Sequence, residues 1–160
     1  MVKIFLEEDA KKDKYGGYYV FDEWRNELFD LEFKVNFGLL VHIKDTEGNV
    51  IAMVKEKAIS LTSCYEMFLA GNKVGTIKKE FHITSSITKY NMDNTGWYLE
   101  GSVGKHNYTV KDSNDNVVAK VSRTGKKTWD KYEINLTRIE DMMFVIMFMV
   151  AVDCEKSKKK

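Results

Sequence analysis

The chain of 160 residues contains no proline, has only two cysteines and carries a formal net charge of +1. Proline is excluded from central strands, so its absence suits a chain built mostly from paired strands. The cysteines, Cys64 and Cys154, form no metal-ligand or redox spacing. Because the net charge is close to zero, no global field attracts nucleic acid or membranes, and electrostatic binding has to come from local patches.

The N-terminus also lacks an apolar segment. The first residues, MVKIFLEEDAKKDK, contain no apolar core of signal-peptide length, so we expect a cytoplasmic protein, peripheral to the membrane if it meets one. The length predicts a single domain over residues 1–160, with residues 1–16 and 157–160 as flexible ends.

One apolar run stands out near the C-terminus, the eleven residues Met142–Val152. Thr137 and Glu140 before it have capping-box spacing, which predicts a helix from Arg138. A helix that is apolar all round is buried on every face. Eleven residues span roughly 16 Å, far less than the ~30 Å of a bilayer core. We therefore predict a helix at the centre of a soluble domain and not a membrane anchor.

The side chains that we assign to this central helix are Met142, Phe144, Val145, Ile146, Phe148, Met149 and Val152. Phe144 and Phe148 lie four residues apart, on the same face of a helix. Truncation of either to alanine is expected to cost about 3–5 kcal/mol of stability.

An internal repeat relates residues 44–69 to residues 111–136, with nine of 26 positions identical. Each copy contains short segments with a period of two, which is typical of strands with one buried face, and Asp, Asn and Gly mark the turns. Further strands are expected at Tyr18–Phe21, Glu32–Val35, Leu39–Ile43, Phe81–Ile83, Trp97–Val103 and Tyr108–Lys111.

Many short strands, two similar halves and one apolar helix indicate a mainly β protein. A closed antiparallel barrel of about twelve strands encloses more volume than the inward side chains of its strands can fill, and the helix would fill it. The alternative is a β-sandwich with the helix across one face, which would leave one side of Met142–Val152 in water. We predict the barrel.

The chain resembles the LURP-one-related family, which includes bacterial proteins of the YxjI type and is grouped with tubby C-terminal domains and phospholipid scramblases. The residues that carry the resemblance are Asn26–Phe29, Ile43–Val50, Ser60-Leu61, Tyr65-Glu66, Ile77–Phe81, Tyr98–Gly101, Val117–Val121 and Val152-Asp153. The likeness covers residues 17 to 155. It implies a twelve-stranded barrel around a hydrophobic C-terminal helix and implies little about activity.

Three features of the sequence could indicate catalysis or metal binding: the histidines, Asp153 and residues 112–116. His42, His82 and His106 lie far apart, and none sits in a nucleophile or metal motif. Asp153 is expected to mark the point where the helix emerges into water. Residues 112–116 begin like a calcium loop, but Val117 stands in place of the obligatory glycine and a turn is favoured. We predict no catalytic residue, no metal and no cofactor.

Two surface patches are candidates for binding. The first could bind anionic headgroups and consists of Lys78, Lys79, Arg123, Lys126 and Lys127. The second consists of Ile51, Met53 and Phe68, which occupy positions that are polar or outward-facing in the second copy of the repeat. It is either covered by the N-terminal segment, residues 15–33, which we favour, or open to a partner.

The sequence therefore predicts a non-catalytic binding module for a protein partner or an anionic, phosphoinositide-like lipid surface. Nucleic acid is not expected as a partner. The alternative is a scramblase-like, calcium-responsive membrane-active protein, and a hydrolase that uses a carboxylate near Asp153 is a third possibility.

Overall fold

The computed structural model describes residues 1–8, 16–35, 37–57, 62–80, 88–102, 107–124 and 131–157. Within these ranges the chain forms twelve β-strands, a short 3₁₀ helix and one α-helix. The strands are β1 (Val2–Glu8), β2 (Gly17–Phe21), β3 (Glu27–Val35), β4 (Leu39–Lys44), β5 (Val50–Glu56), β6 (Cys64–Leu69), β7 (Asn72–Glu80), β8 (Thr88–Met92), β9 (Tyr98–Ser102), β10 (Asn107–Lys111), β11 (Val117–Arg123) and β12 (Lys131–Leu136). The helices are η2 (Ile139–Asp141) and α1 (Met142–Ser157).

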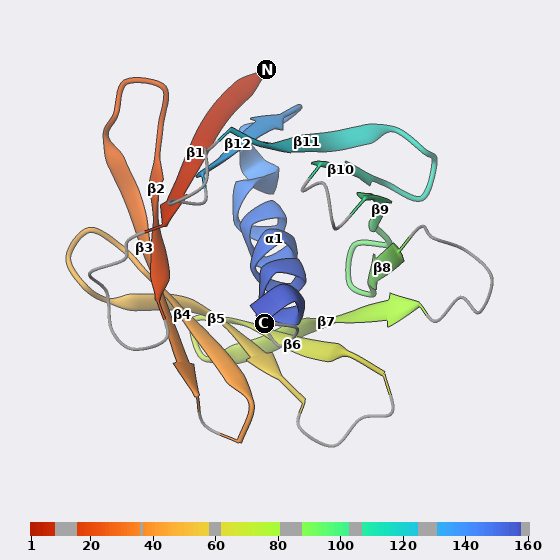
Figure 1. Ribbon diagram of the computed structural model, residues 1–160, viewed down its shortest axis with the longest axis horizontal. Coiled ribbons are helices and arrows are strands. Elements are labelled where there is room, and N and C mark those ends of the chain that lie inside the picture. Colours follow the sequence, from red (N-terminus) through yellow and green to blue (C-terminus); the bar gives the residue numbers. More distant parts are fainter. Residues whose placement is uncertain are drawn as a thin grey trace.

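The strands form a closed antiparallel barrel. Each strand pairs with the next along the chain, and β1 pairs with β12 to complete the ring. Figure 1 shows the strands arranged around α1, which lies in the middle of the molecule. The predicted barrel with a central helix is confirmed, and the β-sandwich is excluded.

The N-terminal residues contribute the strand that closes the barrel. In β1, Ile4 and Leu6 are almost fully buried, and they alternate with Lys3, Phe5 and Glu7 on the outer face. The prediction of a flexible N-terminal end is therefore wrong for Val2–Glu8, because these residues pair with β12 and bury alternate side chains. Residues 9–15 lie outside the described part of the chain.

Strand β8 also differs from the prediction, and one predicted strand cannot be compared. Strand β8 was not predicted, although Tyr90 and Met92 are buried on its inner face. The predicted strand at residues 81–83 lies outside the described residues.

The barrel interior is filled by α1. Residues Val145–Val152 are at most 2% exposed, and they pack against the inward side chains of the strands. Met142 and Phe144 are half-buried at the point where the helix enters the barrel. The Phe144 ring meets the edge of Trp97, with 6.3 Å between ring centroids.

The start of the helix differs from the capping box that the sequence predicted. The hydroxyl of Thr137 donates a hydrogen bond to the backbone carbonyl of Val117 at 2.8 Å and does not cap the helix. A turn of 3₁₀ helix, Ile139–Asp141, follows, and α1 begins only at Met142. A hydroxyl can bond a neighbouring strand as readily as its own chain, and the sequence spacing alone does not distinguish the two.

The two ends of the barrel have different connections. The odd-numbered strands run in one direction, so β1, β3, β5, β7, β9 and β11 all end at the same rim, which we call the loop rim. The opposite rim, the turn rim, carries the turn from β2 to β3, the turn from β4 to β5 and the turn from β10 to β11. Since β12 also ends at the turn rim, α1 enters there and runs toward the loop rim.

These three turns share one hydrogen-bond pattern, and they span Asp22–Asn26, Asp45–Asn49 and Asp112–Asn116. In each, the aspartate carboxylate accepts hydrogen bonds of 2.8–3.0 Å from the backbone N–H groups two and four residues later. The asparagine side chain donates to the other carboxylate oxygen. Hydrogen bonds from the asparagine lower the pKa of the aspartate in all three turns.

The fourth residue of each turn has a positive φ, between 65° and 87°. Glycine occupies this position in the middle turn, as Gly48, whereas Arg25 and Asp115 occupy it in the other two. The strand pairs β5–β6 and β11–β12 also begin and end 67 residues apart.

The burial of α1 predicts unequal effects for its two phenylalanines. Phe148 is fully buried, so Phe148→Ala is expected to lower the free energy of unfolding by about 3–5 kcal/mol. Phe144 is half-exposed, so Phe144→Ala is expected to cost only about 1–2 kcal/mol. Urea denaturation of the two variants measures both values. Near-native stability of Phe148→Ala would contradict the central position of the helix.

Candidate functional site

Four charged side chains face the barrel interior at the loop rim, each opposite a buried tyrosine. The cross-strand pairs are Glu8 with Tyr18, Glu56 with Tyr65, Lys79 with Tyr90, and Arg123 with Tyr132. Residues directly opposite each other in antiparallel strands project from the same face of the sheet. The tyrosines are at most 4% exposed, so the four charged groups line the mouth of the barrel.

The mouth surrounds the second half of α1. A small apolar pocket there is lined by Leu6, Tyr18, Tyr132, Met149 and Val150. The rings of Tyr18 and Tyr132 meet edge to face, with 6.1 Å between centroids. The pocket is too small to admit more than a minor apolar group, so we assign no ligand to it.

The predicted anionic-ligand patch is divided by the fold. Lys78 is exposed on the outer face of β7, whereas Lys79 and Arg123 are half-buried and face the mouth. Strands β8, β9 and β10 separate β7 from β11 around the barrel. Lys126 and Lys127 lie outside the described residues. The sequence placed Lys78 and Lys79 together because they are adjacent, but neighbours in a strand point to opposite faces.

The fold instead groups Lys78 with three other lysines on the outer face, Lys34, Lys55 and Lys57, and we call these four the basic strip. Lys34 and Lys55 both lie opposite Leu40 of the strand between them. The backbone N–H of Lys57 donates to the carbonyl of Cys64 at 2.9 Å, and Cys64 lies opposite Lys78. Neighbouring strands are about 4.8 Å apart, so the four side chains form one surface near the loop rim.

Three members of the basic strip, Lys55, Lys57 and Lys78, are exposed. Lys34 forms an ion pair with Glu32, whose carboxylate lies 3.2 Å from the Lys34 ammonium group. The spacing of Lys55 and Lys57 indicates from sequence alone that both face outward. That Lys34 and Lys78 join them depends on the register of β3 to β7, which the sequence does not reveal.

Exposed apolar side chains lie beside the basic strip. Val35, the last residue of β3, is 52% exposed, and Phe37, in the turn between β3 and β4, is 89% exposed. Phe37 has a positive φ of 53°, a conformation that is rare for a bulky side chain.

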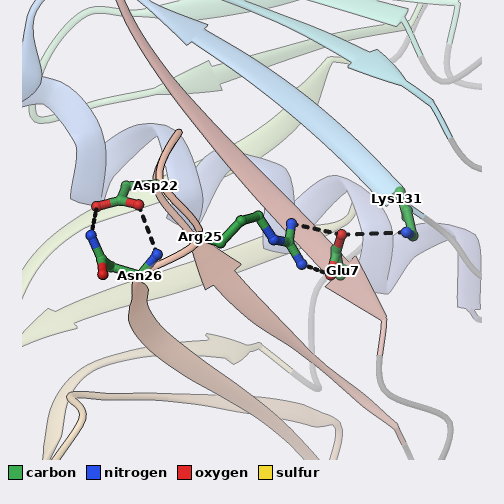
Figure 2. A network of polar contacts seen from close by, with 5 residues as sticks. All are labelled: Glu7, Asp22, Arg25, Asn26 and Lys131. Atoms are coloured by element: carbon green, nitrogen blue, oxygen red, sulfur yellow. Dashed lines mark hydrogen bonds and ion pairs between the residues drawn. The ribbon is translucent and has the colours of Figure 1, made fainter.

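A polar network on the other side of the barrel connects β1, the β2–β3 turn and β12 (Figure 2). Arg25 donates two hydrogen bonds to the carboxylate of Glu7, at 2.9 and 2.8 Å, and the ammonium group of Lys131 lies 3.4 Å from the same carboxylate. The Arg25 guanidinium also lies 4.3 Å from the centre of the Phe21 ring. The hydrogen bond from Arg25 lowers the pKa of Glu7 below its usual value.

Figure 2 also shows how Arg25 is held, because Asp22 and Asn26 form the turn that presents it. Arg25 and Lys131 both pair with Glu7, and the Asp22 carboxylate accepts hydrogen bonds within its own turn. We therefore interpret it as a structural clasp between the closing strand β1 and its neighbours.

The second predicted patch lies on the outer face of β5 and β6. Met53 lies opposite Phe68, and His42 of β4 lies on the other side of Met53. Met53 and Phe68 are half-buried, and Ile51 packs against the core. Burial and then the charge of Lys34 lower the pKa of His42.

The N-terminal segment does not cover this face in its described residues. Residues 17–21 and 27–35 form β2 and β3 of the barrel wall, and β4 separates β3 from β5. Tyr18 and Phe33 point inward, with 5.7 Å between ring centroids. The expectation of intramolecular cover is therefore wrong for residues 16–33, because their aromatic side chains belong to the core and the outer wall.

The residues considered for chemistry do not gather into a site within the described part of the chain. His82 and His106 lie outside the described residues, as does the side chain of Asp153. The Asp112 carboxylate accepts hydrogen bonds from its own turn, as the turn interpretation requires. In the ranges that the structure describes, no three His, Cys, Asp or Glu side chains could together hold a metal ion.

The described residues also contain no helix with the length and apolar character that crossing a bilayer requires. Helix α1 is 16 residues long, and its apolar residues are enclosed by the barrel.

A closed twelve-stranded barrel filled by an apolar C-terminal helix, with this order of sequence motifs, defines a class of protein. The LURP-one-related family model matches residues 2–153, and the chain belongs to this family. It is 21% identical over 154 residues to the uncharacterized protein YxjI of Bacillus subtilis (strain 168), and the aligned region covers 96% of this chain and 93% of that protein. An X-ray structure of a protein from Arabidopsis thaliana shares the fold, with a TM-score of 0.60 and 18% identity over 94% of this chain and 91% of the other.

The clasp predicts a pH-dependent contribution to stability. Glu7→Gln is expected to lower the free energy of unfolding by about 1 kcal/mol at pH 7, since a bidentate pair with Arg25 is lost. The pKa of Glu7 is lower in the folded state than its ordinary value of 4.5. Its contribution is therefore present above about pH 4.5 and is lost as the pH falls through the lowered pKa.

Urea denaturation of wild type and Glu7→Gln at neutral and strongly acidic pH tests this expectation. Glu23→Gln is the matched control, because it removes an exposed carboxylate from the adjacent turn. The same deficit at both pH values, or an equal deficit in the control, would contradict the role of the clasp.

Proposed function

We propose that this protein is a non-catalytic binding module that binds an anionic, phosphoinositide-like membrane surface through its loop rim. It would act in the cytoplasm, at the periphery of the membrane. The observation that carries the proposal is the basic strip, Lys34, Lys55, Lys57 and Lys78, which the register of five consecutive strands, β3 to β7, brings onto one outer surface.

The distribution of charge along the barrel supports this orientation. Carboxylates at the turn rim and on η2 are Asp22, Glu23, Asp45, Glu47, Asp93, Asp112, Asp115, Glu140 and Asp141. The exposed lysines of the basic strip lie at the other end. A molecule with a small net charge can still be attracted end-on to a charged surface when its charges are separated in this way.

The strength of the attraction is modest. A lysine near an anionic bilayer contributes roughly 1 kcal/mol, so four contribute roughly 4 kcal/mol, which corresponds to a dissociation constant of about 1 mM. Lasting attachment to a membrane generally requires a second signal beside a basic patch. The basic strip alone therefore supports weak, salt-sensitive binding.

A second candidate function is binding of a protein partner. The half-buried pair Met53 and Phe68 supports it, because the two side chains lie opposite each other on the outer wall and the described N-terminal residues leave them uncovered. A protein partner would be the leading idea if vesicle binding failed.

The remaining alternatives have less support. A scramblase-like mechanism needs α1 to leave the barrel, and each large side chain of Val145–Val152 would lose roughly 1.5–3 kcal/mol of burial. The sum exceeds the stability of an ordinary domain. A hydrolase needs polar groups that converge in a cleft, and the pocket that the described residues form beside α1 is small and apolar.

The proposal predicts that the protein floats with phosphatidylcholine vesicles that contain phosphatidylinositol bisphosphate and not with phosphatidylcholine alone. Substitution of Lys55, Lys57 and Lys78 by glutamine is expected to weaken this binding by roughly 100-fold, from about 1 kcal/mol per lysine. Raising the salt concentration is expected to reduce wild-type binding, because mobile ions screen the attraction.

The matched control replaces three basic residues away from the loop rim, Lys111, Lys120 and Arg138, by glutamine. It changes the net charge equally and is expected to bind the vesicles within a few-fold of wild type. An equal loss in both triple variants would show that net charge matters and the basic strip does not. Absence of vesicle binding at any salt concentration would overturn the proposal.

A further inference from the structure

The turn between β3 and β4 presents an aromatic side chain to water in an uncommon backbone conformation. Phe37 is 89% exposed and has a φ of 53°, and Val35 before it is 52% exposed. The side chain contributes little to the core from this position. An apolar residue that is both exposed and held in a rarely populated conformation points to a role outside the fold.

The residues after Phe37 connect the β3–β4 turn to the rest of the barrel. Gly38 approaches β5 so closely that a Cβ added there would lie 3.4 Å from the carbonyl oxygen of Glu56, and its φ of 127° favours glycine. Leu39, which follows, packs against the core. The backbone that follows Phe37 is therefore anchored to β5 and to the core, while the Phe37 side chain itself stays exposed.

The tip lies next to the basic strip. Lys34 is on the strand that leads into the turn, and Lys55 and Lys57 are on or directly after β5, which the turn approaches at Gly38. Lysines around an exposed aromatic and aliphatic tip match a bilayer, which offers anionic headgroups to the charges and hydrocarbon to the apolar side chains.

We infer that Phe37, with Val35 beside it, inserts into the acyl chains of an anionic bilayer while the basic strip binds the headgroups. This inference rests on the proposed function and adds the apolar half of the contact. It supplies the second signal that four lysines lack. A soluble phosphate compound would engage the lysines and leave Phe37 in water.

The first test places a reporter at the tip. Phe37→Trp is measured with vesicles of phosphatidylcholine and phosphatidylinositol bisphosphate whose phosphatidylcholine has brominated acyl chains, which quench tryptophan on contact. We expect the variant to be quenched on binding and the wild type to be quenched much less. Both proteins are measured with Trp129→Phe, because Trp129 belongs to the connection from β11 to β12. The native tryptophans that remain, the exposed Trp24 and the buried Trp97, lie in the β2–β3 and β8–β9 turns at the opposite rim.

The second test measures affinity. Phe37→Asn, in which asparagine tolerates the positive φ, is expected to bind the same vesicles about tenfold more weakly. Its affinity for soluble inositol hexakisphosphate is expected to be unchanged. Trp24→Ala removes an exposed aromatic side chain from the turn rim and is expected to bind vesicles as the wild type does.

The outcomes separate this inference from the proposed function. Salt-sensitive vesicle binding without quenching of Phe37→Trp, and without loss in Phe37→Asn, would overturn the insertion and leave the proposed function intact. An equal loss of binding to vesicles and to inositol hexakisphosphate would also overturn insertion. If the wild type binds no vesicles, both the insertion and the proposed function fall.

Discussion

The burial of one apolar helix inside a closed sheet is the interaction on which this structure depends. Helix α1 has no polar face over Val145–Val152, so water cannot solvate any side of it. A barrel of twelve strands has an interior too wide for its own side chains to fill. The barrel therefore buries the apolar helix, and the helix fills the barrel interior. The outer surface of the barrel is left free to carry charge.

The two rims follow from this arrangement. At the turn rim, three aspartate–asparagine turns fold back on themselves through their own hydrogen bonds, which engages their carboxylates within the turn. At the loop rim, charged groups alternate between the mouth, as Lys79 does, and the outer wall, as Lys78 does. The alternation of a strand thus divides one basic sequence between two environments.

Much of the fold could be predicted from the sequence, because its signals are local. The period of two in β11 and β12 and the unbroken apolar run of α1 each identify an element, and the need to bury that run selects the barrel. What could not be predicted depends on contacts between distant residues. Thr137 has the spacing of a helix cap, yet its hydroxyl bonds to Val117, which lies 20 residues away.

The candidate site was predicted less well for the same physical reason. Sequence adjacency predicts one patch for Lys78 and Lys79, whereas the basic strip is assembled across five strands by their register. Phe37 gives no signal in the sequence, since its exposure and its positive φ are properties of the folded β3–β4 turn. Strand β1 was missed because two buried residues, Ile4 and Leu6, are a short signal.

The pairing of β1 with β12 has a consequence for folding during synthesis. Strand β1 is synthesised before its partner β12, so the barrel cannot close until β12 is made, and the helix that fills it is made later still. During synthesis the nascent chain therefore exposes strand edges and an unfilled interior until β12 and α1 have left the exit tunnel. Folds that depend on such distant contacts form slowly and are prone to aggregate before completion.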